Sequence, residues 1–418
     1  MLYFIGIGSN LGNREQTINS AIRCVNSLGE MLGVAPFYYS RPEGFDSQNE
    51  FCNTAVALTS DLSPAEVLRL CQQTEKQLGR TEQSVILPDG SKQYADREID
   101  IDLLCAYDEG GLEVTRHTPK LTLPHPRMAE RKFVQIPLHN LVNRVIQDSA
   151  LTFYKMHGLG NDYIYFDCTN DNMPLLLLPV IRSAALVLCN RHKGIGADGL
   201  VFILPDKRAD LRMRIFNADG SEAEMCGNAA RCVGLYAMVF HLVDGYTMKL
   251  ATKGGIRKIA FETSGELSVE MGKPSYTGTQ EIDGRTYHCI DVGNPHAVTI
   301  LDDSEALTHD LVHTVGPLIE HHPLFPHRTN VEFCVVLDRH HVAMRVWERG
   351  SGETQACGTG ATATAVACIQ QGLCDSPVTV TLLGGKLTIH HNSRTTQMTG
   401  KARIVYSGKL SYIDFNVL

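Results

Sequence analysis

The amino-acid sequence predicts a mixed α/β protein in two parts, the second of which holds two similar lobes. Three observations carry this prediction. The chain has 418 residues, which corresponds to two or three domains at about 150 residues per domain. Strand-like and helix-like patterns alternate over residues 1–110. Further along the chain, a stretch of 20 residues recurs after a shift of 131 positions.

Elements of the first part follow one another as strand, helix, strand, helix and strand. The predicted strands are 2–10, 51–60 and 97–107, and the predicted helices are 13–29 and 63–79. Ser63 is a good N-cap for the second helix, and Pro64 suits its first position. This order indicates a small α/β or α+β sandwich. A polar stretch then leads to a new strand-like segment, so we place the boundary near 148–151.

Composition and charge exclude several classes of protein. The net charge of −8 argues against a nucleic-acid or acidic-membrane surface. Thirteen cysteines are scattered without a Cys-x-x-Cys pair, which excludes a small disulfide scaffold and gives no spacing for a structural zinc site. The amino terminus lacks the pattern of a signal peptide, and the longest apolar run, 175–189, is broken by Pro179 and Arg182. We therefore expect a cytoplasmic protein with reduced thiols and no membrane partner.

The second part contains an internal repeat. Leu211–Ala230, "LRMRIFNADGSEAEMCGNAA", aligns without gaps with Val342–Ala361, "VAMRVWERGSGETQACGTGA". The identical pairs are Met213/Met344, Arg214/Arg345, Glu222/Glu353, Cys226/Cys357, Gly227/Gly358 and Ala230/Ala361. Both copies have an alternating strand, a polar loop, and a cysteine that opens an alanine-rich helix. We predict two lobes related by a pseudo-two-fold axis, each with one cysteine at a helix N-terminus.

Two facing cysteines at helix N-termini can act as an acid and a base. A free thiol titrates near ~8.5, and a helix N-terminus lowers that pKa and attracts a carboxylate. One thiolate can remove a Cα proton while the opposite thiol delivers a proton to the other face, which inverts the carbon without a cofactor. A reversible disulfide between Cys226 and Cys357 is a rival use. Buried packing is expected for Cys232, Cys368 and Cys374, and no Cys–His–Asn/Asp set favours a cysteine hydrolase.

Over residues 152–418 the chain resembles diaminopimelate epimerase. The matching motifs are "KMHGLGNDY", "RHKGIGADG", "FNADGSEAEMCGNAARC", "VGNPHAV", "RTNVEF" and "ERGSGETQACGTGA". Proline racemases and phenazine-pathway isomerases are similar in fold. The resemblance implies two pseudo-symmetric lobes, each with strands around a central helix. It also implies that Cys226 and Cys357 interconvert LL- and meso-diaminopimelate, a step of lysine and peptidoglycan synthesis, without pyridoxal phosphate or metal.

The same resemblance assigns further residues to the site. The residues implied to bind the distal end of the substrate and the groups near the reacting carbon are Asn161, Asn217, Asn294 and Asn330. Those implied to bind its charged ends are Glu348 and Arg349, and those implied to hold the α-carboxylate are Gly227, Asn228, Gly358 and Thr359. His296 and Glu348 would tune the thiols. Two positions depart from the family pattern: Gly199, where a polar side chain is common, and Ala229, where glycine is common.

Paired carboxylates are the main chemical feature of the first part. Asp100 and Asp102 lie two residues apart on a predicted strand, and therefore on the same face. Carboxylates on one face, with basic residues nearby, suit magnesium and a polyphosphate. The available basic residues are Arg80, Arg97, His125 and Arg131. The alternation is also compatible with an ordinary half-exposed strand, and the sequence has no GxxxxGK[ST] phosphate loop.

Over residues 1–140 the chain resembles hydroxymethyldihydropterin pyrophosphokinase, whose fold is ferredoxin-like. The matching stretches are "GIGSNLGNR", "EFCNTAVAL", "LSPAEVLRLCQQTEKQLGR", "REIDIDLL" and "LTLPHPRMAERKFVQIPL". The implied magnesium ligands are Asp100 and Asp102, the implied ATP contacts are Arg80, Arg97, His125 and Arg131, and the implied pterin contacts are Phe51, Asn53 and Phe133. Departures are Glu82 in place of a basic residue, a loop insertion with Tyr94 near the usual Trp, and a shortened tail.

We therefore predict a fusion with domains 1–150 and 151–418, the latter with lobes 151–270 and 271–418. Its epimerase needs no cofactor, whereas its pyrophosphokinase uses ATP and magnesium. Small molecules are the expected partners, and a homodimer is left open. Three alternatives remain: an epimerase with a catalytically weak amino-terminal domain, a redox-switched thiol protein, and a proline-type racemase.

Overall fold

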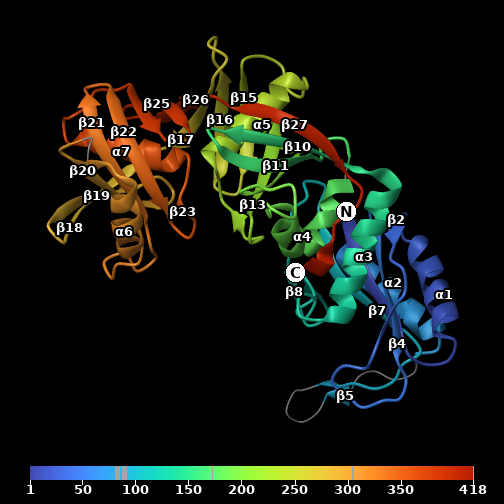
Figure 1. Cartoon of the computed structure of the whole chain (residues 1–418). Coiled ribbons are helices and arrows are strands. Elements are labelled where there is room, and N and C mark those ends of the chain that lie inside the picture. Colours follow the sequence, from blue (N-terminus) through green and yellow to red (C-terminus); the bar gives the residue numbers. More distant parts are fainter. Residues whose placement is uncertain (81–84, 87–91, 172, 304–305, 418) are drawn as a thin grey trace. The chain divides into compact units, whose positions relative to one another are not determined.

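In the computed structural model, the chain separates into two units (Figure 1). The described residues are 1–80, 85–86, 92–171, 173–303 and 306–417. The amino-terminal unit comprises Met1–Thr152, Asn170–Val187 and Lys409–Leu418, and the carboxy-terminal unit comprises Phe153–Thr169 and Leu188–Gly408. The division into functional domains at 150/151 stays a prediction, because two later segments pack with the amino-terminal unit.

A five-stranded antiparallel sheet forms the centre of the amino-terminal unit. Its strands are β1 (Leu2–Ser9), β2 (Glu30–Val34), β3 (Tyr38–Ser40), β4 (Phe51–Thr59) and β7 (Asp100–Tyr107). The order is β2-β4-β1-β7, and β3 also pairs with β4. The three long strands confirm the sequence predictions. We did not predict β2 and β3, which are short and only partly buried. Two further hairpins are β5 (Val85–Ile86) with β6 (Lys92–Gln93), and β8 (Arg116–His117) with β9 (Thr122–Leu123).

Two predicted helices cover one face of this sheet. They are α1 (Arg14–Asn26) and α2 (Pro64–Gln77). Ser63 caps α2 in a full capping box with Glu66, and Pro64 is the first helical residue, as predicted. Apolar residues of both helices pack against alternate residues of β1, β4 and β7. The other side chains of these strands, among them Asp100 and Asp102, therefore point to the opposite face.

The opposite face is covered by α3 (Lys132–Ser149), a helix that the sequence analysis did not predict. It contains Pro137 and ends in the polar stretch where we placed the boundary between the two parts. Leu141 and Val145 pack closely over Gly33 of β2, where any β-carbon would lie 2.6 Å from Val145. Tertiary packing of this apolar stripe outweighs the weak local pattern.

The last residues of the chain pack on α3. Asn143 donates from Nδ2 to the carbonyl oxygen of Ile413 at 2.9 Å and accepts the Ile413 N–H at 2.8 Å. His139 stacks on Phe415 with ring centroids 4.1 Å apart. A segment near residue 410 therefore completes the amino-terminal unit, whose own tail looked shortened in the sequence.

Asn143→Ala is expected to destabilise the amino-terminal unit by about 1–3 kcal/mol, because both backbone groups of Ile413 lose their partner. Asn143→Asp keeps the acceptor oxygen and loses only the N–H donor, so this variant should lose less stability than Asn143→Ala. Denaturant unfolding of the full chain measures both. Equal stability of wild type and Asn143→Ala would contradict this role of the carboxy-terminal segment.

The carboxy-terminal unit is a continuous closed sheet around two central helices, α5 (Gly227–Val239) and α7 (Gly358–Gln370) (Figure 1). Its strands are β10 (Leu151–Gly158), β11 (Asn161–Asp167), β12 (Gly199–Leu204), β13 (Leu211–Asn217), β14 (Glu222–Ala223), β15 (Thr247–Thr252), β16 (Gly255–Phe261), β17 (Leu267–Gly272), β18 (Ser275–Ile282), β19 (Arg285–Asp291), β20 (Pro295–Leu301), β21 (Asn330–Asp338), β22 (His341–Glu348), β23 (Gly352–Glu353), β24 (Val378–Leu382), β25 (Gly385–His391), β26 (Thr396–Gly400) and β27 (Arg403–Leu410). The helix α6 (His309–Glu320) also belongs to this unit, whereas η1 (Met173–Val180), α4 (Ile181–Leu188) up to Val187, and η3 (Phe415–Val417) belong to the amino-terminal unit.

The two lobes repeat the same pairing pattern. β11 pairs in parallel with β12, as β20 does with β21, and β13 pairs in parallel with β15, as β22 does with β24. Both central helices span 13 residues, and their first residues, Gly227 and Gly358, are 131 positions apart. The structure thus confirms the pseudo-symmetric, two-lobed fold that the internal repeat predicted.

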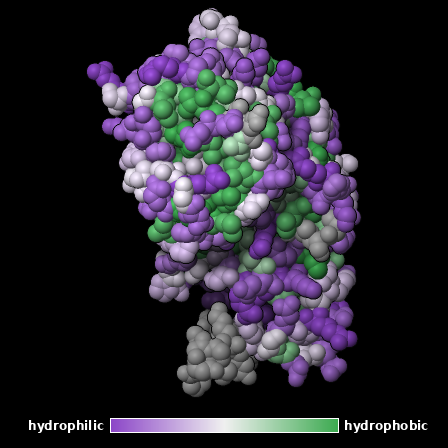
Figure 2. Space-filling view, turned by 60° about the vertical axis from the view of Figure 1, so that its left-hand side comes forward, coloured by the Kyte–Doolittle hydropathy of each residue, from purple (hydrophilic) through white to green (hydrophobic). Residues whose placement is uncertain are grey.

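Polar and apolar side chains share the surface. Hydrophilic residues cover much of the face shown in Figure 2, and apolar residues gather in a broad band within it. Among the described residues, no helix combines the length and the apolar character needed to cross a membrane. An exposed apolar band is compatible with self-association, so a homodimer stays a prediction.

Candidate active sites

The N-termini of α5 and α7 meet, and each starts at a cysteine. Cys226 is the N-cap of α5 and Cys357 the N-cap of α7. A β-carbon at Gly227 would lie 2.5 Å from the end of the Met398 side chain, and one at Gly358 would lie 2.8 Å from it, so both helix starts pack closely against this methionine. The two cysteines that the repeat paired across 131 positions therefore occupy adjoining helix starts.

Asn228 joins the two helix starts directly. Its Nδ2 donates to the carbonyl oxygen of Ala356, the residue before Cys357, at 2.9 Å. It also donates to Oδ1 of Asn161 at 3.1 Å, and the Cys226 thiol donates to the same oxygen at 3.4 Å. Asn161 and Asn228, both predicted to bind substrate, thus contact the surroundings of both cysteines.

Burial keeps the Cys226 thiol protonated. It raises the thiol pKa, and the carboxylate of Glu348 raises it further. The backbone N–H of Ala229 and the Tyr163 hydroxyl, 3.8 Å from the sulfur, act in the opposite direction. Additional positive charge in the site would lower the pKa of this thiol.

Cys357 lies in a similar environment. Burial raises its pKa well above the ordinary value, and the carboxylates of Glu348 and Glu332 raise it further. Its sulfur accepts the N–H of Gly360 at 3.3 Å and lies 3.4 Å from the Thr359 hydroxyl. The pKa of Glu348 is itself raised by burial. One carboxyl group thus influences both thiols.

A chain of side chains links His296 to Cys357. His296 Nδ1 lies 2.6 Å from Oε1 of Glu332, and its Nε2 lies 3.1 Å from Oδ1 of Asn294. Asn294 donates to the hydroxyl of Thr359 at 3.4 Å, and that hydroxyl contacts the sulfur. We missed Glu332, although it lies two positions from Asn330 on β21 and so faces the same side of the sheet.

The other predicted substrate residues lie at strand ends. Asn330 donates to the carbonyl oxygen of Pro295 at 3.0 Å and accepts the Arg349 N–H at 2.9 Å. The exposed Arg349 donates from Nη1 to the carbonyl oxygen of His327 at 3.2 Å. Asn217 is exposed and donates to the Ser221 hydroxyl at 3.0 Å. These contacts orient the turns that follow β13 and β22.

The backbone explains the departure at Gly199. A β-carbon there would lie 2.1 Å from the carbonyl oxygen of Phe216 and 2.9 Å from the ring of Tyr163. No side chain fits at this position without a shift of the backbone. The same tight packing holds the Tyr163 ring, whose hydroxyl contacts Cys226.

Arg231 is a buried residue of the site that the sequence analysis did not identify. Its side chain is fully buried, Nη2 donates to Oδ1 of Asn228 at 2.8 Å, and Nη1 contacts the sulfur of Met398 at 3.4 Å. Its Nε has no hydrogen-bond partner among the described residues, and burial lowers the guanidinium pKa. Arg231 thus fixes the amide of Asn228 from behind, one helical turn along α5.

Arg231→Met is expected to leave the unfolding free energy within about 2 kcal/mol of wild type, because Met fills similar volume and removes a buried charge. Arg231→Ala leaves a cavity and should cost about 3–5 kcal/mol. Turnover by the epimerase that the sequence resemblance implies should fall in both, because the Asn228 amide loses its support. Denaturant unfolding and turnover assays separate the two effects, and a wild-type rate for Arg231→Met would rule out the positioning role.

A pocket of about 730 Å³ opens on the α3 side of the sheet in the amino-terminal unit. Its lining includes the predicted residues Phe51, Asn53, Arg97, Asp100, Asp102, Arg131 and Phe133. Gly6 and Gly8 of β1, paired with Asp102 and Asp100, keep its floor free of side chains. Arg80 and His125 are not among the described residues that line it.

Basic residues form ion pairs with Asp100, one of the two predicted metal ligands. Asp100 accepts an ion pair from Arg80 at 2.7 Å and another from Arg97 at 2.9 Å, and Arg80 also pairs with the buried Glu75. Burial, and then the charge of Asp100, raise the pKa of Asp102 from 3.8 to about 7. The pocket therefore holds a buried carboxyl group that keeps its proton to a higher pH than usual, although Arg97 and Arg131 act to lower its pKa.

Aromatic rings and arginines form the rest of the pocket. Phe51 contacts Phe45 edge to face at 6.3 Å, and Arg131 lies over the Phe133 ring at 5.3 Å. Asn53 donates to the Ser40 hydroxyl at 3.0 Å. We missed the lining residue Arg127, and we named Tyr94 only as a departure within the loop insertion. Arg127 Nη1 donates to the Tyr94 hydroxyl at 2.9 Å, and both residues line the pocket. Glu82 and residues 84 and 87–91 of the insertion lie outside the described residues.

Asp102→Asn is expected to stabilise the amino-terminal unit more at pH 8 than at pH 5. The folded pKa of about 7 exceeds the unfolded one, so the folded state holds a proton that the unfolded state loses. The contribution of Asp102 to the free energy of unfolding is fully present below the pKa that Asp102 has in the unfolded chain. It is lost as the pH rises through about 7. Melting curves in magnesium-free buffer test this. Asp100→Asn, which breaks two ion pairs, serves as the destabilising control, and equal effects of Asp102→Asn at both pH values would contradict the account.

Comparisons with known proteins identify a family for each part of the chain. Residues 153–277 and 288–405 match the family model of diaminopimelate epimerase, and residues 4–143 match that of 7,8-dihydro-6-hydroxymethylpterin-pyrophosphokinase. The diaminopimelate epimerase of Acetivibrio thermocellus is 42% identical over 291 residues, which cover 64% of this chain and all of that protein. That of Pseudomonas syringae is 42% identical over 280 residues, 62% of this chain and 99% of that protein.

Solved structures give a more distant likeness. A hydroxyproline epimerase from Agrobacterium vitis is 14% identical, with a TM-score of 0.49 over 62% of this chain and 91% of that one. The chain therefore belongs to the diaminopimelate epimerase family and carries, before that part, a 7,8-dihydro-6-hydroxymethylpterin-pyrophosphokinase part, which makes it an enzyme with an isomerase and a transferase in one polypeptide.

Proposed function

We propose that the carboxy-terminal unit interconverts LL- and meso-2,6-diaminopimelate with Cys226 and Cys357 as its acid/base pair. The observation that carries this proposal is the meeting of two equivalent helix N-termini, each starting at a cysteine and joined by Asn228. The reaction needs no pyridoxal phosphate and no metal ion, because both proton transfers are assigned to thiols.

The substrate's α-carboxylate would bind between the helix starts, at Gly227 and Asn228 on one side and Gly358 and Thr359 on the other. Backbone N–H groups there favour an anion. The α-ammonium group would add the positive charge that lowers the thiol pKa values. One thiolate then takes the Cα proton, and the opposite thiol gives its own proton to the other face, so the enzyme ends with the two protonation states exchanged.

Residues around the two cysteines have supporting roles in this proposal. Glu348, which influences the pKa of both thiols, would share their protons between turnovers, and His296 would act on Cys357 through Asn294 and Thr359. Asn161, Asn217, Asn330 and Arg349 would bind the distal end of the substrate, where Arg349 suits a carboxylate.

Substrate choice tests this assignment against a proline-type racemase. The full chain should convert LL-diaminopimelate to the meso form and leave L-proline unchanged, as followed by chiral chromatography. Inversion of proline without turnover of diaminopimelate would overturn the proposal, because proline has no distal amino-acid end for Arg349 and the asparagines to bind.

We propose further that the amino-terminal unit transfers pyrophosphate from ATP to 6-hydroxymethyl-dihydropterin. The pocket's residue types fit each part of the substrates: Phe51 and Phe133 for stacking on the pterin, Asn53 for its edge, and Arg97, Arg127 and Arg131 for phosphates. Arg80 would act through Asp100, and His125 would contact ATP from the loop before α3.

Magnesium fits the carboxylates of Asp100 and Asp102, because burial and the charge of Asp100 raise the pKa of Asp102, and a divalent cation would offset both effects. When bound, magnesium supplies charge that neutralises phosphate oxygens. Asp100 and Asp102 would hold it in the pocket, while the arginines orient the phosphates and bring the pterin hydroxyl into line with them. This step belongs to folate synthesis and the epimerase step to lysine and peptidoglycan synthesis, so the fusion implies no transfer of intermediates.

A further inference from the structure

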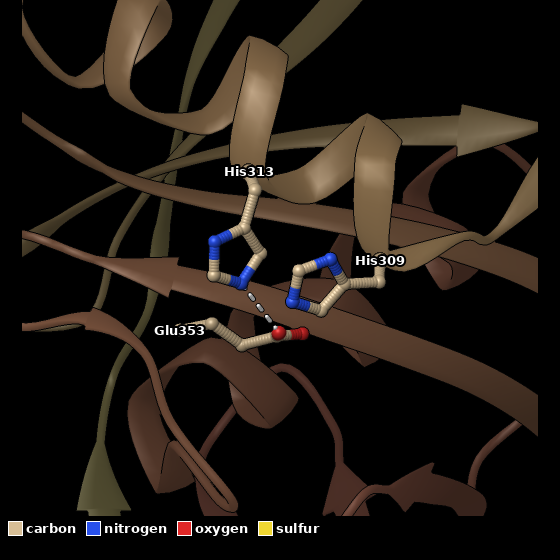
Figure 3. A group of neighbouring side chains, drawn as sticks. All are labelled: His309, His313 and Glu353. Atoms are coloured by element: carbon tan, nitrogen blue, oxygen red, sulfur yellow. Dashed lines mark hydrogen bonds and ion pairs between the residues drawn. The ribbon is translucent and has the colours of Figure 1, made fainter.

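Two histidines and a glutamate outside the thiol site form a compact cluster (Figure 3). His309 and His313 lie one turn apart on α6, and Glu353 lies on β23. The ligand atoms of all three residues lie within 4.8 Å of one another. The imidazole rings stack with centroids 3.8 Å apart, and His313 Nε2 lies 2.9 Å from Oε2 of Glu353. Nothing in the proposed epimerase or pyrophosphokinase chemistry uses this cluster.

Comparison of the lobes separates the histidine pair from the structural role of the glutamate. Glu353 pairs with Arg345 at 2.7 and 2.9 Å, and its equivalent in the first lobe, Glu222, pairs with Arg214 at 2.7 Å. The first lobe places an ammonium group, Lys253 Nζ, 3.8 Å from Glu222. The second lobe instead places imidazole nitrogens beside its glutamate. The arginine–glutamate pair is common to both lobes and therefore belongs to the fold. The histidines beside the glutamate are a feature of the second lobe.

We propose that His309, His313 and Glu353 bind a divalent transition-metal ion of the zinc type. Two imidazole nitrogens one helical turn apart, with one carboxylate oxygen, form a three-residue ligand set that leaves a fourth position for water. Both imidazoles are accessible, with side-chain exposures of 64% and 40%, so they can rotate toward a common ion. Arg345 holds the carboxylate in place, and the Trp347 ring meets His313 edge-on at 5.3 Å.

The bound ion would fasten α6 to the β22–β23 hairpin. This hairpin already rests on α6, because Glu320 accepts the Trp347 Nε1–H at 2.8 Å and the Gly350 N–H at 2.9 Å. Glu348 and Arg349, which we assign to the substrate site, lie in the same hairpin. The metal would therefore hold in place the hairpin that carries Glu348 and Arg349, and it would take no part in proton transfer. Because it binds the folded state, it raises stability with concentration.

Cobalt(II) titration of the full chain tests the proposal, since its spectrum distinguishes nitrogen and oxygen ligands from thiolates. Wild type should bind one equivalent with weak visible bands and show a higher melting temperature. His309→Ala and His313→Ala should each lose that equivalent and the shift, while leaving circular dichroism unchanged. His321→Ala, an exposed histidine at the end of the same helix, is the matched control and should behave as wild type.

Thiols are the competing ligands, because all thirteen cysteines are free. An intense sulfur-to-cobalt band without the weak bands would assign the metal to cysteines and overturn the proposal. Equal stoichiometry in wild type and in the His309→Ala/His313→Ala double variant would overturn it as well. Neither result would affect the proposed epimerase, which is assayed separately by turnover of diaminopimelate.

Discussion

Cys357→Ala is expected to lower epimerase turnover by about 10²–10⁴-fold or more, the range typical of losing a positioned acid or base. The variant retains the helix start and its backbone N–H groups, so substrate binding should change far less than kcat. Cys226→Ala should show an equivalent loss, because the lobes contribute equivalent groups. Kinetics in both directions with LL- and meso-diaminopimelate measure the effect.

Cys368→Ala is the matched control, since Cys368 lies on the same helix and is fully buried in the core. It should retain most of the activity at a modest cost in stability. A redox-switched thiol protein predicts a different pattern, in which Cys357→Ser leaves epimerisation intact and only the response to oxidants disappears. Wild-type turnover in Cys357→Ser would therefore contradict the acid/base account.

Asp102→Ala is expected to lower pyrophosphoryl transfer by about 10³-fold, because the pocket loses a group that would hold the charge-neutralising ion over the phosphates. Epimerase activity of the same protein should be unchanged, which provides an internal control for folding of the carboxy-terminal unit. Asp61→Asn, an exposed carboxylate outside the pocket, should leave both activities unchanged. Transfer is measured as AMP release that depends on the pterin and on magnesium.

The wild-type chain decides between an active and a weak amino-terminal domain. Pterin-dependent AMP release in magnesium supports the bifunctional enzyme. Its absence would favour the alternative, in which the loop insertion and Glu82 have removed the activity while the fold persists. Because Arg127 and Tyr94 face the pocket beside Arg131, we expect the altered loop to retain phosphate contacts.

Local pattern predicted the three long strands and the first two helices of the amino-terminal unit, but neither its short strands nor the helix α3 that completes it. The strands β1, β4 and β7 alternate clearly, and the cap at Ser63 fixes the start of α2. By contrast, α3 depends on packing over Gly33 and on Asn143, whose partner Ile413 lies 270 residues away. Contacts over such separations leave no periodic signal in either segment.

The internal repeat predicted the pairing of Cys226 with Cys357, because it reports symmetry rather than local propensity. Residues that act through another residue were harder to find. The roles of Arg231 and Glu332 follow only from their contacts in the folded structure: Arg231 bonds to Asn228, and Glu332 bonds to His296. The histidine cluster was missed for a similar reason, since Glu353 lies 40 residues beyond His313.

The position of solvent hydrogen in the product tests the two-base mechanism most directly. The full chain is run to low conversion of LL-diaminopimelate in D₂O, and product and recovered substrate are analysed by mass spectrometry. The account predicts one deuterium at the inverted carbon of the product, delivered by the second thiol, and almost none in recovered substrate. A product that retains the substrate's own proton would show that one base serves both faces, and would contradict the account.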